Sequence, residues 1–347
     1  MGHDDVITIS TFRNRRINLA KKGLLLAWTS SVTMVIFSLF NSGAQERVLS
    51  HLDGSLWTTI ITALVVLGVC EFAAGIILII YKVATGTPLA EYKRLWNIKS
   101  SRIALCSALS AGPVATCSLM IAITLCGITY ANSLLSLAPM IVAIASRILF
   151  KEKASPRVYI GIAIAVTGVI VASYSPPEGV ENFYLGIFFA CFAPIGFAIE
   201  SMLSSKVMDL TDPIEVCSLY RCLGGGVFGV GISFIICLVQ GKLTLFADVF
   251  QIAFSDNTVI FYLVITAIFI AIEYGTIYVA YNYCGPTRGT ALVFSTPIWS
   301  IPIGFLLNSV FPYQVTMLGI VGAVVVVVGM VLIVMRPSEL FSLREYE

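Results

Sequence analysis

The segment 122-AITLCGITYANSLLSLAP-139 has a counterpart 158 residues later, 280-AYNYCGPTRGTALVFSTP-297. A Cys-Gly pair and a proline occupy the same places in both, and a glycine recurs further along at the same offset. The identities at this offset include Ala122, Cys126, Gly127, Thr129, Leu134, Pro139, Leu149 and Gly161, which fall on Ala280, Cys284, Gly285, Thr287, Leu292, Pro297, Leu307 and Gly319. The chain is therefore predicted to consist of two related halves.

The composition places both halves in a membrane. Of the 347 residues 58% are hydrophobic and only 12% are charged, and the mean hydropathy is +0.94, whereas a soluble domain has about 25% charged residues. The net charge of +2 gives no reason to expect a nucleic-acid partner. The N-terminal stretch is polar and lacks the short apolar core of a cleavable signal peptide.

A spanning helix needs about 20 apolar residues, and ten such segments are predicted: 23–41, 57–81, 103–124, 129–149, 157–174, 183–205, 213–239, 257–281, 288–308 and 314–335. With the N-terminus inside, seventeen of the 21 Lys and Arg residues lie in cytoplasmic segments and only Arg47 and Lys242 in outer loops. This asymmetry predicts an all-α integral membrane protein of the cell (inner) membrane with both termini in the cytoplasm.

Each half contains five spans, an odd number, so the second half must cross the bilayer in the opposite direction. The predicted division is a cytoplasmic tail over 1–22, a first five-helix repeat over 23–174, a second, inverted repeat over 175–336 and a cytoplasmic tail over 337–347. The basic loop 151-KEKASPR-157 and its uncharged counterpart 309-SVFPYQV-315 agree with opposite orientations. Inverted repeats are typical of secondary transporters, whose substrate lies near the membrane midplane.

Prolines interrupt three spans: Pro139 and Pro297 at matched positions, and Pro194 in the sixth. A proline frees a backbone carbonyl, which is tolerated where it lines a cavity, although a simple kink explains each one equally well.

The pattern 134-LLSLAPMIVAIASRILFKEK-153, followed by 157-RVYIGIAIAVTGVIVA-172, resembles the EamA type of the drug/metabolite transporter superfamily. A narrower likeness, to bacterial Lic-type choline-uptake permeases, lies in 111-AGP-113, 182-NFYLGIFFACFAPIGFAIESMLSS-205, Tyr220-Arg221, 274-YGTIYVAYN-282 and 286-PTRGTALVFSTPIW-299. The resemblance implies uptake of a quaternary amine bound among aromatic rings. Phe197 stands where that group favours tryptophan, a departure that bears on the ligand more than on the fold.

Ionisable residues inside the bilayer are costly and mark functional sites. Glu71 lies near the midplane and is interpreted as a counter-charge for a cation or a proton carrier, or else as a protonated carboxyl bonded to a neighbouring helix. Glu273 is divided between the same two roles. Glu200 comes to the depth of Arg221, because only a short loop joins their spans. The two are predicted to form a structural or gating pair, with substrate contact and snorkelling of Glu200 as alternatives.

Aromatic residues inside the spans complete the candidate binding site. A quaternary ammonium has no proton to donate, so ring faces and a nearby negative charge must bind it. The substrate-binding candidates are Trp28, Glu71, Phe197, Glu273, Tyr274, Tyr278 and Trp299. Any one of these rings alone is more commonly a packing or lipid-facing residue; the set is what favours a cage.

Other chemistry is disfavoured. With two histidines and no CxxC pair, neither a metal site nor a cofactor is expected. The run 224-GGGVFG-229 matches GxGxxG but lies inside a span, so its glycines are interpreted as helix-packing positions. No GxxxxGK[ST] phosphate loop occurs, which favours a gradient-driven carrier that is not an enzyme. The segment 83–101, with Trp96 among basic residues, is predicted to lie near anionic headgroups.

The sequence thus predicts an alternating-access transporter for choline or a related organic cation, with a proton or sodium ion as a candidate coupling ion and the lipid bilayer as its environment. The alternatives are an EamA-type exporter of amino acids or other small metabolites, and a non-transporting membrane receptor or scaffold.

Overall fold

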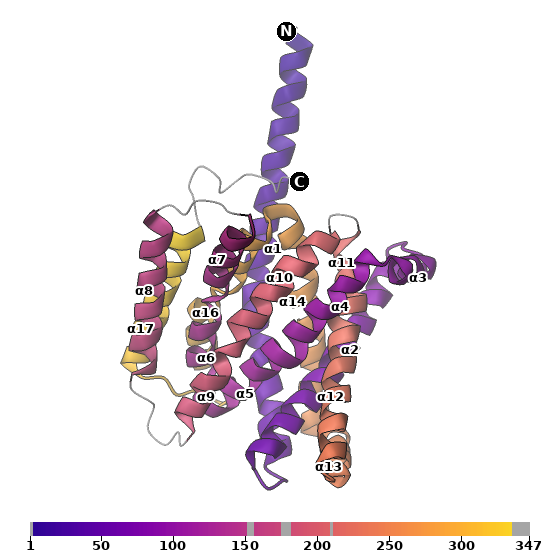
Figure 1. Cartoon of the computed structure of the whole chain (residues 1–347), viewed down its shortest axis with the longest axis vertical. Helices are drawn as coiled ribbons and strands as arrows, with labels where there is room; N and C mark the ends of the chain where they lie inside the picture. Colours follow the sequence, from indigo (N-terminus) through magenta and orange to yellow (C-terminus); the bar gives the residue numbers. More distant parts are fainter. Residues whose placement is uncertain (1–2, 151–155, 175–181, 209–210, 335–347) are drawn as a thin grey trace.

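The structure is a computed structural model that describes residues 3–150, 156–174, 182–208 and 211–334. The predicted C-terminal tail and most of the basic 151–157 loop lie outside these residues. Regular structure in the described part is helical throughout (Figure 1). The elements are α1 (His3–Leu49), α2 (Leu56–Ala84), α3 (Leu89–Asn97), η1 (Ser100–Arg102), α4 (Ile103–Leu109), η2 (Ser110–Thr116), α5 (Cys117–Cys126), α6 (Ile128–Leu135), α7 (Ala138–Phe150), α8 (Pro156–Ser173), α9 (Phe183–Ala190), α10 (Phe192–Met208), α11 (Pro213–Val216), η3 (Cys217–Gly224), α12 (Gly225–Val239), α13 (Leu243–Ser255), α14 (Asn257–Cys284), α15 (Pro286–Val293), α16 (Thr296–Leu306) and α17 (Met317–Val334).

Eight helical segments of the described chain are long and apolar enough to cross a membrane. They coincide with eight of the ten predicted spans. The remaining two predictions, the fifth and the tenth, fall on shorter apolar helices over Tyr159–Ser173 and Met317–Leu332. The protein is therefore an all-helical, multi-pass membrane protein.

The first helix is longer than predicted at both ends. It begins at His3, so the segment predicted as a tail continues the helix, and it ends at Leu49 rather than near residue 41. The hydropathy falls after residue 41 because polar residues follow. Asn41 and Gln45 are nonetheless fully buried, and the Gln45 amide donates to Asn41 Oδ1 across 2.5 Å. These polar side chains face the protein interior, and the span predicted from hydropathy was therefore too short.

Three spans are interrupted near the prolines that the sequence singled out. Breaks separate α6 from α7 just before Pro139, α9 from α10 just before Pro194, and α15 from α16 just before Pro297. The first and last breaks meet, because the Ser136 hydroxyl donates to the Phe294 carbonyl across 2.5 Å. Proline is tolerated near the start of a helix, because the N–H groups of the first turn have no partner within the helix.

Element boundaries recur at the sequence offset of 158. Thus α6 and α15 begin and end at equivalent residues, and α5 and α14 end at equivalent cysteines. The glycines that follow, Gly127 (φ 90°, ψ 154°) and Gly285 (φ 81°, ψ 158°), have nearly the same backbone conformation. Positive φ at both places requires glycine, which explains why the Cys-Gly pair is present in both halves.

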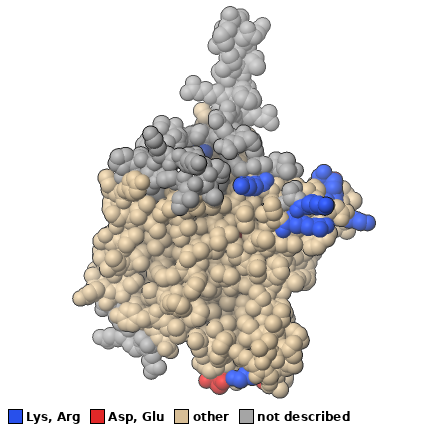
Figure 2. Space-filling view, in the orientation of Figure 1, with Lys and Arg blue, Asp and Glu red and all other residues tan. Residues whose placement is uncertain are grey.

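Two short helices lie in connections between the longer apolar helices. Helix α3 follows α2, and α13, which the sequence analysis did not predict, follows α12; they lie at opposite ends of the molecule (Figure 1). Figure 2 shows Lys and Arg side chains gathered at the end that carries α3. At the other end, Arg47 Nε is 2.7 Å from Asp256 Oδ2, and this hydrogen bond helps hold the pKa of the Asp256 carboxyl below its usual range.

Helices α8 and α17 pack side by side at one edge of the protein (Figure 1). Glycine permits this approach: a Cβ on Gly322 would lie 2.4 Å from Ala172 N, and a Cβ on Gly168 would lie 2.6 Å from Val326 N. Small residues at such contacts let membrane helices approach to backbone distance.

Replacing Gly322 by leucine is therefore expected to lower the melting temperature of the purified protein by several degrees, since overpacking costs about 1–3 kcal/mol and here it meets backbone. Val321→Leu is the matched control, because Val321 is 47% exposed on the outer face of the same turn. Equal melting temperatures for the two variants would show that α8 and α17 do not pack closely in the membrane protein.

Candidate functional site: a buried ion network

Arg221 lies at the centre of a charged network inside the protein. Its side chain is fully buried on the π-helical segment η3. Nη1 donates to Glu71 Oε1 across 2.8 Å. Nε is 3.0 Å from Glu200 Oε1, an ion pair whose angle does not make a hydrogen bond. The arginine thus joins α2 to α10, one carboxylate on each side.

The remaining terminal nitrogen of the guanidinium, Nη2, contacts Tyr274 and Thr116. Nη2 donates to Thr116 Oγ1 across 3.0 Å and also to the Tyr274 hydroxyl. The guanidinium carbon lies 4.2 Å from the centroid of the Tyr274 ring, within the range of a cation–π interaction. The Tyr274 hydroxyl is 3.5 Å from Glu71 Oε1, so the acid, the arginine and the ring form one unit.

Glu200 is the start of a chain of hydroxyl groups. Its Oε1 accepts from the Tyr278 hydroxyl across 2.9 Å. Tyr278 is 3.1 Å from the Ser204 hydroxyl, which is 3.0 Å from the hydroxyl of Ser107. This chain connects α10, α14 and α4 and fixes the Glu200 carboxylate through a ring from the second half.

Two glycines make room for the Glu71–Arg221 pair. A Cβ on Gly225 would lie 2.4 Å from Glu71 Oε2 and 2.8 Å from Arg221 Nη1, and a Cβ on Gly112 would lie 3.0 Å from the same Glu71 oxygen. The run 224-GGGVFG-229 therefore has a second role besides helix packing. Its packing role is also present, since Gly226 approaches the Gly68 carbonyl on α2.

Acidic side chains outnumber basic side chains in this interior. The charged side chains that are buried among the described residues are Glu71, Glu200, Glu273 and Arg221. Glu71 Oε2 and Glu273 Oε2 have no hydrogen-bond partner. A buried carboxylate without a partner is costly, so one arginine leaves these acids under-compensated, and a proton or a further cation would complete the site.

Glu273 lies apart from the arginine. Its Oε1 accepts a hydrogen bond of 3.0 Å from Ser30 on α1, whereas its neighbour in sequence, Tyr274, contacts Arg221. Glu273 therefore joins α14 to α1, which is the interhelical role considered for it. Its second oxygen, Oε2, has no hydrogen-bond partner and is available for the other role, that of a counter-charge or proton carrier.

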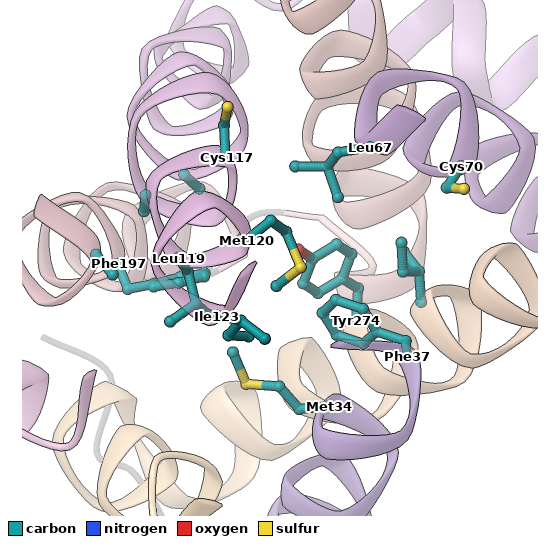
Figure 3. Packing of buried hydrophobic residues seen from close by; sticks show 14 of the residues in the cluster. Met34, Phe37, Leu67, Cys70, Cys117, Leu119, Met120, Ile123, Phe197 and Tyr274 are labelled. Carbon is teal, nitrogen blue, oxygen red and sulfur yellow. The ribbon is translucent and has the colours of Figure 1, made fainter. Parts of the chain in front are cut away.

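The rings do not form a single cage. Phe197 packs against Phe294 with centroids 5.2 Å apart. Figure 3 shows apolar side chains, among them Leu119 and Met120, between Phe197 and Tyr274. Trp28, which is 48% exposed, contacts Trp299 edge-on at 5.6 Å. No ring contact of the described residues connects that pair with Tyr274 or Tyr278.

Two grooves lie outside the ion network. One of about 530 Å³ is bounded by α2, α12 and α13 and includes Phe72 and Phe250. Another, of about 420 Å³, is bounded by α1, α2 and α14. Neither groove includes a residue of the ion network, whose charged side chains and tyrosines are all buried. Within the described chain, no group of three or more His, Cys, Asp or Glu side chains could hold a metal ion.

Sequence reasoning found the charged residues and the tyrosines of the network but not all of its members or contacts. It paired Arg221 with Glu200 by depth and treated Glu71 separately, whereas the structure places both acids on the same arginine. It missed Thr116, Ser204 and Ser107. The offset of 158 residues between Thr116 and Tyr274 was a signal that could have brought these two together, because the two halves of the sequence match at the same offset.

Apolar spanning helices around a buried ion network define a multi-pass membrane protein. A model of the Triose-phosphate Transporter family matches residues 59–333, and the chain belongs to this family of membrane transporters. The family lies within the drug/metabolite transporter superfamily, so the resemblance to that superfamily seen in the sequence is confirmed.

One curated protein and one solved structure are also similar to this chain. Protein LicB of Haemophilus influenzae is 26% identical over 202 residues, which cover 58% of this chain and 65% of LicB; the match thus spans somewhat less than two thirds of the curated relative. A crystal structure of a protein that is 14% identical superposes with a TM-score of 0.49, covering 92% of this chain and 96% of the other.

Proposed function

We propose that this protein is a secondary-active transporter that takes up choline or a related organic cation through the cell membrane. The observation that carries the proposal is the excess of buried acids over buried bases, with one oxygen of Glu71 and one of Glu273 lacking a partner. An organic cation or a coupling proton supplies the missing positive charge. The resemblance to Lic-type permeases supports the choice of cation.

Tyr274 supports the same ligand class. Its ring faces a delocalised cation, the Arg221 guanidinium, and its hydroxyl is near Glu71. A quaternary ammonium needs the same pair of groups, a ring face and a carboxylate. In the proposed mechanism the substrate cation competes with Arg221 for Tyr274 and Glu71, and the displaced arginine stays with Glu200. Tyr278 and Phe197 line the route, and Trp28 and Trp299 join the cage when the conformation changes.

We also propose that ten helices form two inverted repeats with both termini in the cytoplasm. The shared element boundaries, the matched glycine conformations and the position of α3 and α13 at opposite ends support this arrangement. Two contacts join residues separated by the repeat offset, Thr116 with Tyr274 and Ser136 with Phe294, and such contacts are expected for equivalent residues beside a two-fold axis. The breaks before Pro139 and Pro297 then form the hinge for alternating access, with Pro194 as a third break.

Other substrates fit less well. The family description names triose phosphates, but a doubly charged phosphate ester needs several uncompensated bases, and Arg221 is held by two carboxylates. Export of amino acids or other small metabolites, the EamA-type alternative, would use the carboxylates for an ammonium group and Arg221 for a carboxylate. A receptor or scaffold would have no use for buried acids or for matched helix breaks.

Thermal shift of the purified protein tests the proposed substrate. Choline is expected to raise the melting temperature, because a ligand that binds only the folded state stabilises it. Betaine, ethanolamine, amino acids and sugar phosphates form the comparison panel. Stabilisation by a sugar phosphate and by no cation would contradict the proposal, and stabilisation by amino acids alone would favour the exporter.

A further inference from the structure

Helix α3 is expected at the membrane surface because it lies in the connection between two spanning segments. It is the connection between α2, which ends at Ala84, and α4, which begins at Ile103, and both belong to spanning segments. Tyr92 and Leu95 are buried against the protein. On the outer side Leu89 is 64% and Trp96 46% exposed, so the helix presents apolar side chains where the headgroups begin.

Basic side chains surround these apolar residues. The exposed positions of this segment include Lys93, Arg94, Lys99 and Arg102, and blue atoms gather at this end of the molecule in Figure 2. Arg94 is paired with Glu91, and Arg102 Nε donates to the Trp96 carbonyl, which leaves two exposed lysines. Basic and apolar residues on one surface helix are typical of a segment that binds anionic lipid.

The buried side of α3 is bonded to the segment that carries Arg221. The Ser218 hydroxyl donates to the Tyr92 hydroxyl across 3.3 Å. The Tyr220 hydroxyl donates to the Leu95 carbonyl across 3.1 Å and is 2.8 Å from the Ser101 hydroxyl. The Trp96 and Tyr220 rings are stacked with centroids 6.0 Å apart.

Tyr220 immediately precedes Arg221 in the π-helical segment η3. π-Helical turns are rare and occur frequently at functional sites. Because two hydroxyls and a stacked ring fasten α3 to η3, a shift of α3 in the membrane surface must act on the backbone that positions Arg221.

We propose that α3 binds the headgroups of anionic lipids and that this binding sets the position of η3 and, through Tyr220, the ion network of Arg221. Anionic lipid thereby regulates the affinity of the central site. A soluble polyanion would match the lysines but leave Leu89 and Trp96 in water, which favours lipid. Lipid binding by α3 does not depend on the identity of the substrate. Its effect on choline binding rests on the proposed function.

Lipid binding is measured first, with the full chain in nanodiscs of phosphatidylcholine to which phosphatidylglycerol is added. The double variant Lys93→Gln/Lys99→Gln is expected to bind phosphatidylglycerol about 30-fold more weakly, roughly fivefold for each charge near the surface. The control is Lys242→Gln, an exposed lysine beside α13 at the opposite end, which should bind as the wild type does. Wild-type affinity in the double variant overturns the proposed surface.

Coupling is measured with Tyr220→Phe, which keeps the ring stack and removes the hydroxyl bonded to Leu95 and Ser101. This variant is expected to bind phosphatidylglycerol normally, while its thermal shift by choline no longer depends on that lipid. If the dependence persists in Tyr220→Phe, the coupling is wrong. A wild-type protein that binds phosphatidylglycerol at α3 but responds to no choline contradicts the proposed substrate and leaves the lipid surface standing.

Discussion

Replacing Arg221 by methionine is expected to lower the stability of the protein more than any other single change in the network. The variant leaves Glu71 and Glu200 buried without their shared partner, and breaking a buried ion pair from one side costs about 3–5 kcal/mol. The melting temperature in detergent should fall strongly, and uptake of choline into vesicles should be lost. Arg221→Lys should rescue little, because a single ammonium cannot reproduce the forked contacts to two acids, a threonine and a tyrosine.

The triple variant Arg221→Met/Glu71→Gln/Glu200→Gln separates charge from packing. Neutral glutamines remove the uncompensated charges, so most of the lost stability should return while transport stays absent. A melting temperature of Arg221→Met close to that of the wild type would contradict the buried network. A triple variant no more stable than Arg221→Met would mean that the arginine acts mainly by filling space.

Replacing Glu71 by glutamine is expected to abolish stabilisation by choline while the protein stays folded. The glutamine keeps the size of the side chain and an oxygen for Arg221, and Glu200 still compensates the arginine. What is lost is the charge that faces the substrate. Removing one partner of a desolvated charge pair costs about 2–5 kcal/mol, which corresponds to binding weakened at least about 30-fold.

Glu200→Gln is the matched control, because it removes the same charge from the other side of the same arginine. Its carboxylate is already occupied by Tyr278, so choline should still stabilise this variant, and only the rate of uptake should fall. Undiminished choline transport by Glu71→Gln would remove that residue from the mechanism. Equal loss of binding in both variants would place Glu200 in the binding site as well.

The spans and the charged residues could be predicted because they depend on local composition. The limits of α2 and of the segment over residues 213–239 were predicted to within a few residues, since a bilayer sets the length of an apolar run. The end of α1 was not, because Asn41 and Gln45 lower the hydropathy although they face the interior. Hydropathy averages over a helix and carries no information on which side of it is buried.

The candidate site divides in the same way. Glu71, Glu200, Arg221 and Glu273 could be selected as candidates from the sequence, because a charged residue inside an apolar span is costly and easily recognised. Which acid meets the arginine depends on helix rotation and on approach distances, and these are set by glycines such as Gly112 and Gly225 whose partners lie far away in the chain. Spacing along one helix could not reveal them.

By itself, the sequence determined the membrane class, the positions of the eight apolar segments that are long enough to span a membrane, the paired Cys-Gly landmarks and the small set of ionisable residues inside the spans. These properties follow from hydrophobic transfer and backbone conformation, which are local. The tertiary structure alone decided that Arg221 holds Glu71 as well as Glu200, that the tryptophan pair lies apart from Tyr274, and that α3 is fastened to η3. Such contacts join helices distant in sequence, and their free energy depends on packing that exists only once the helices are assembled.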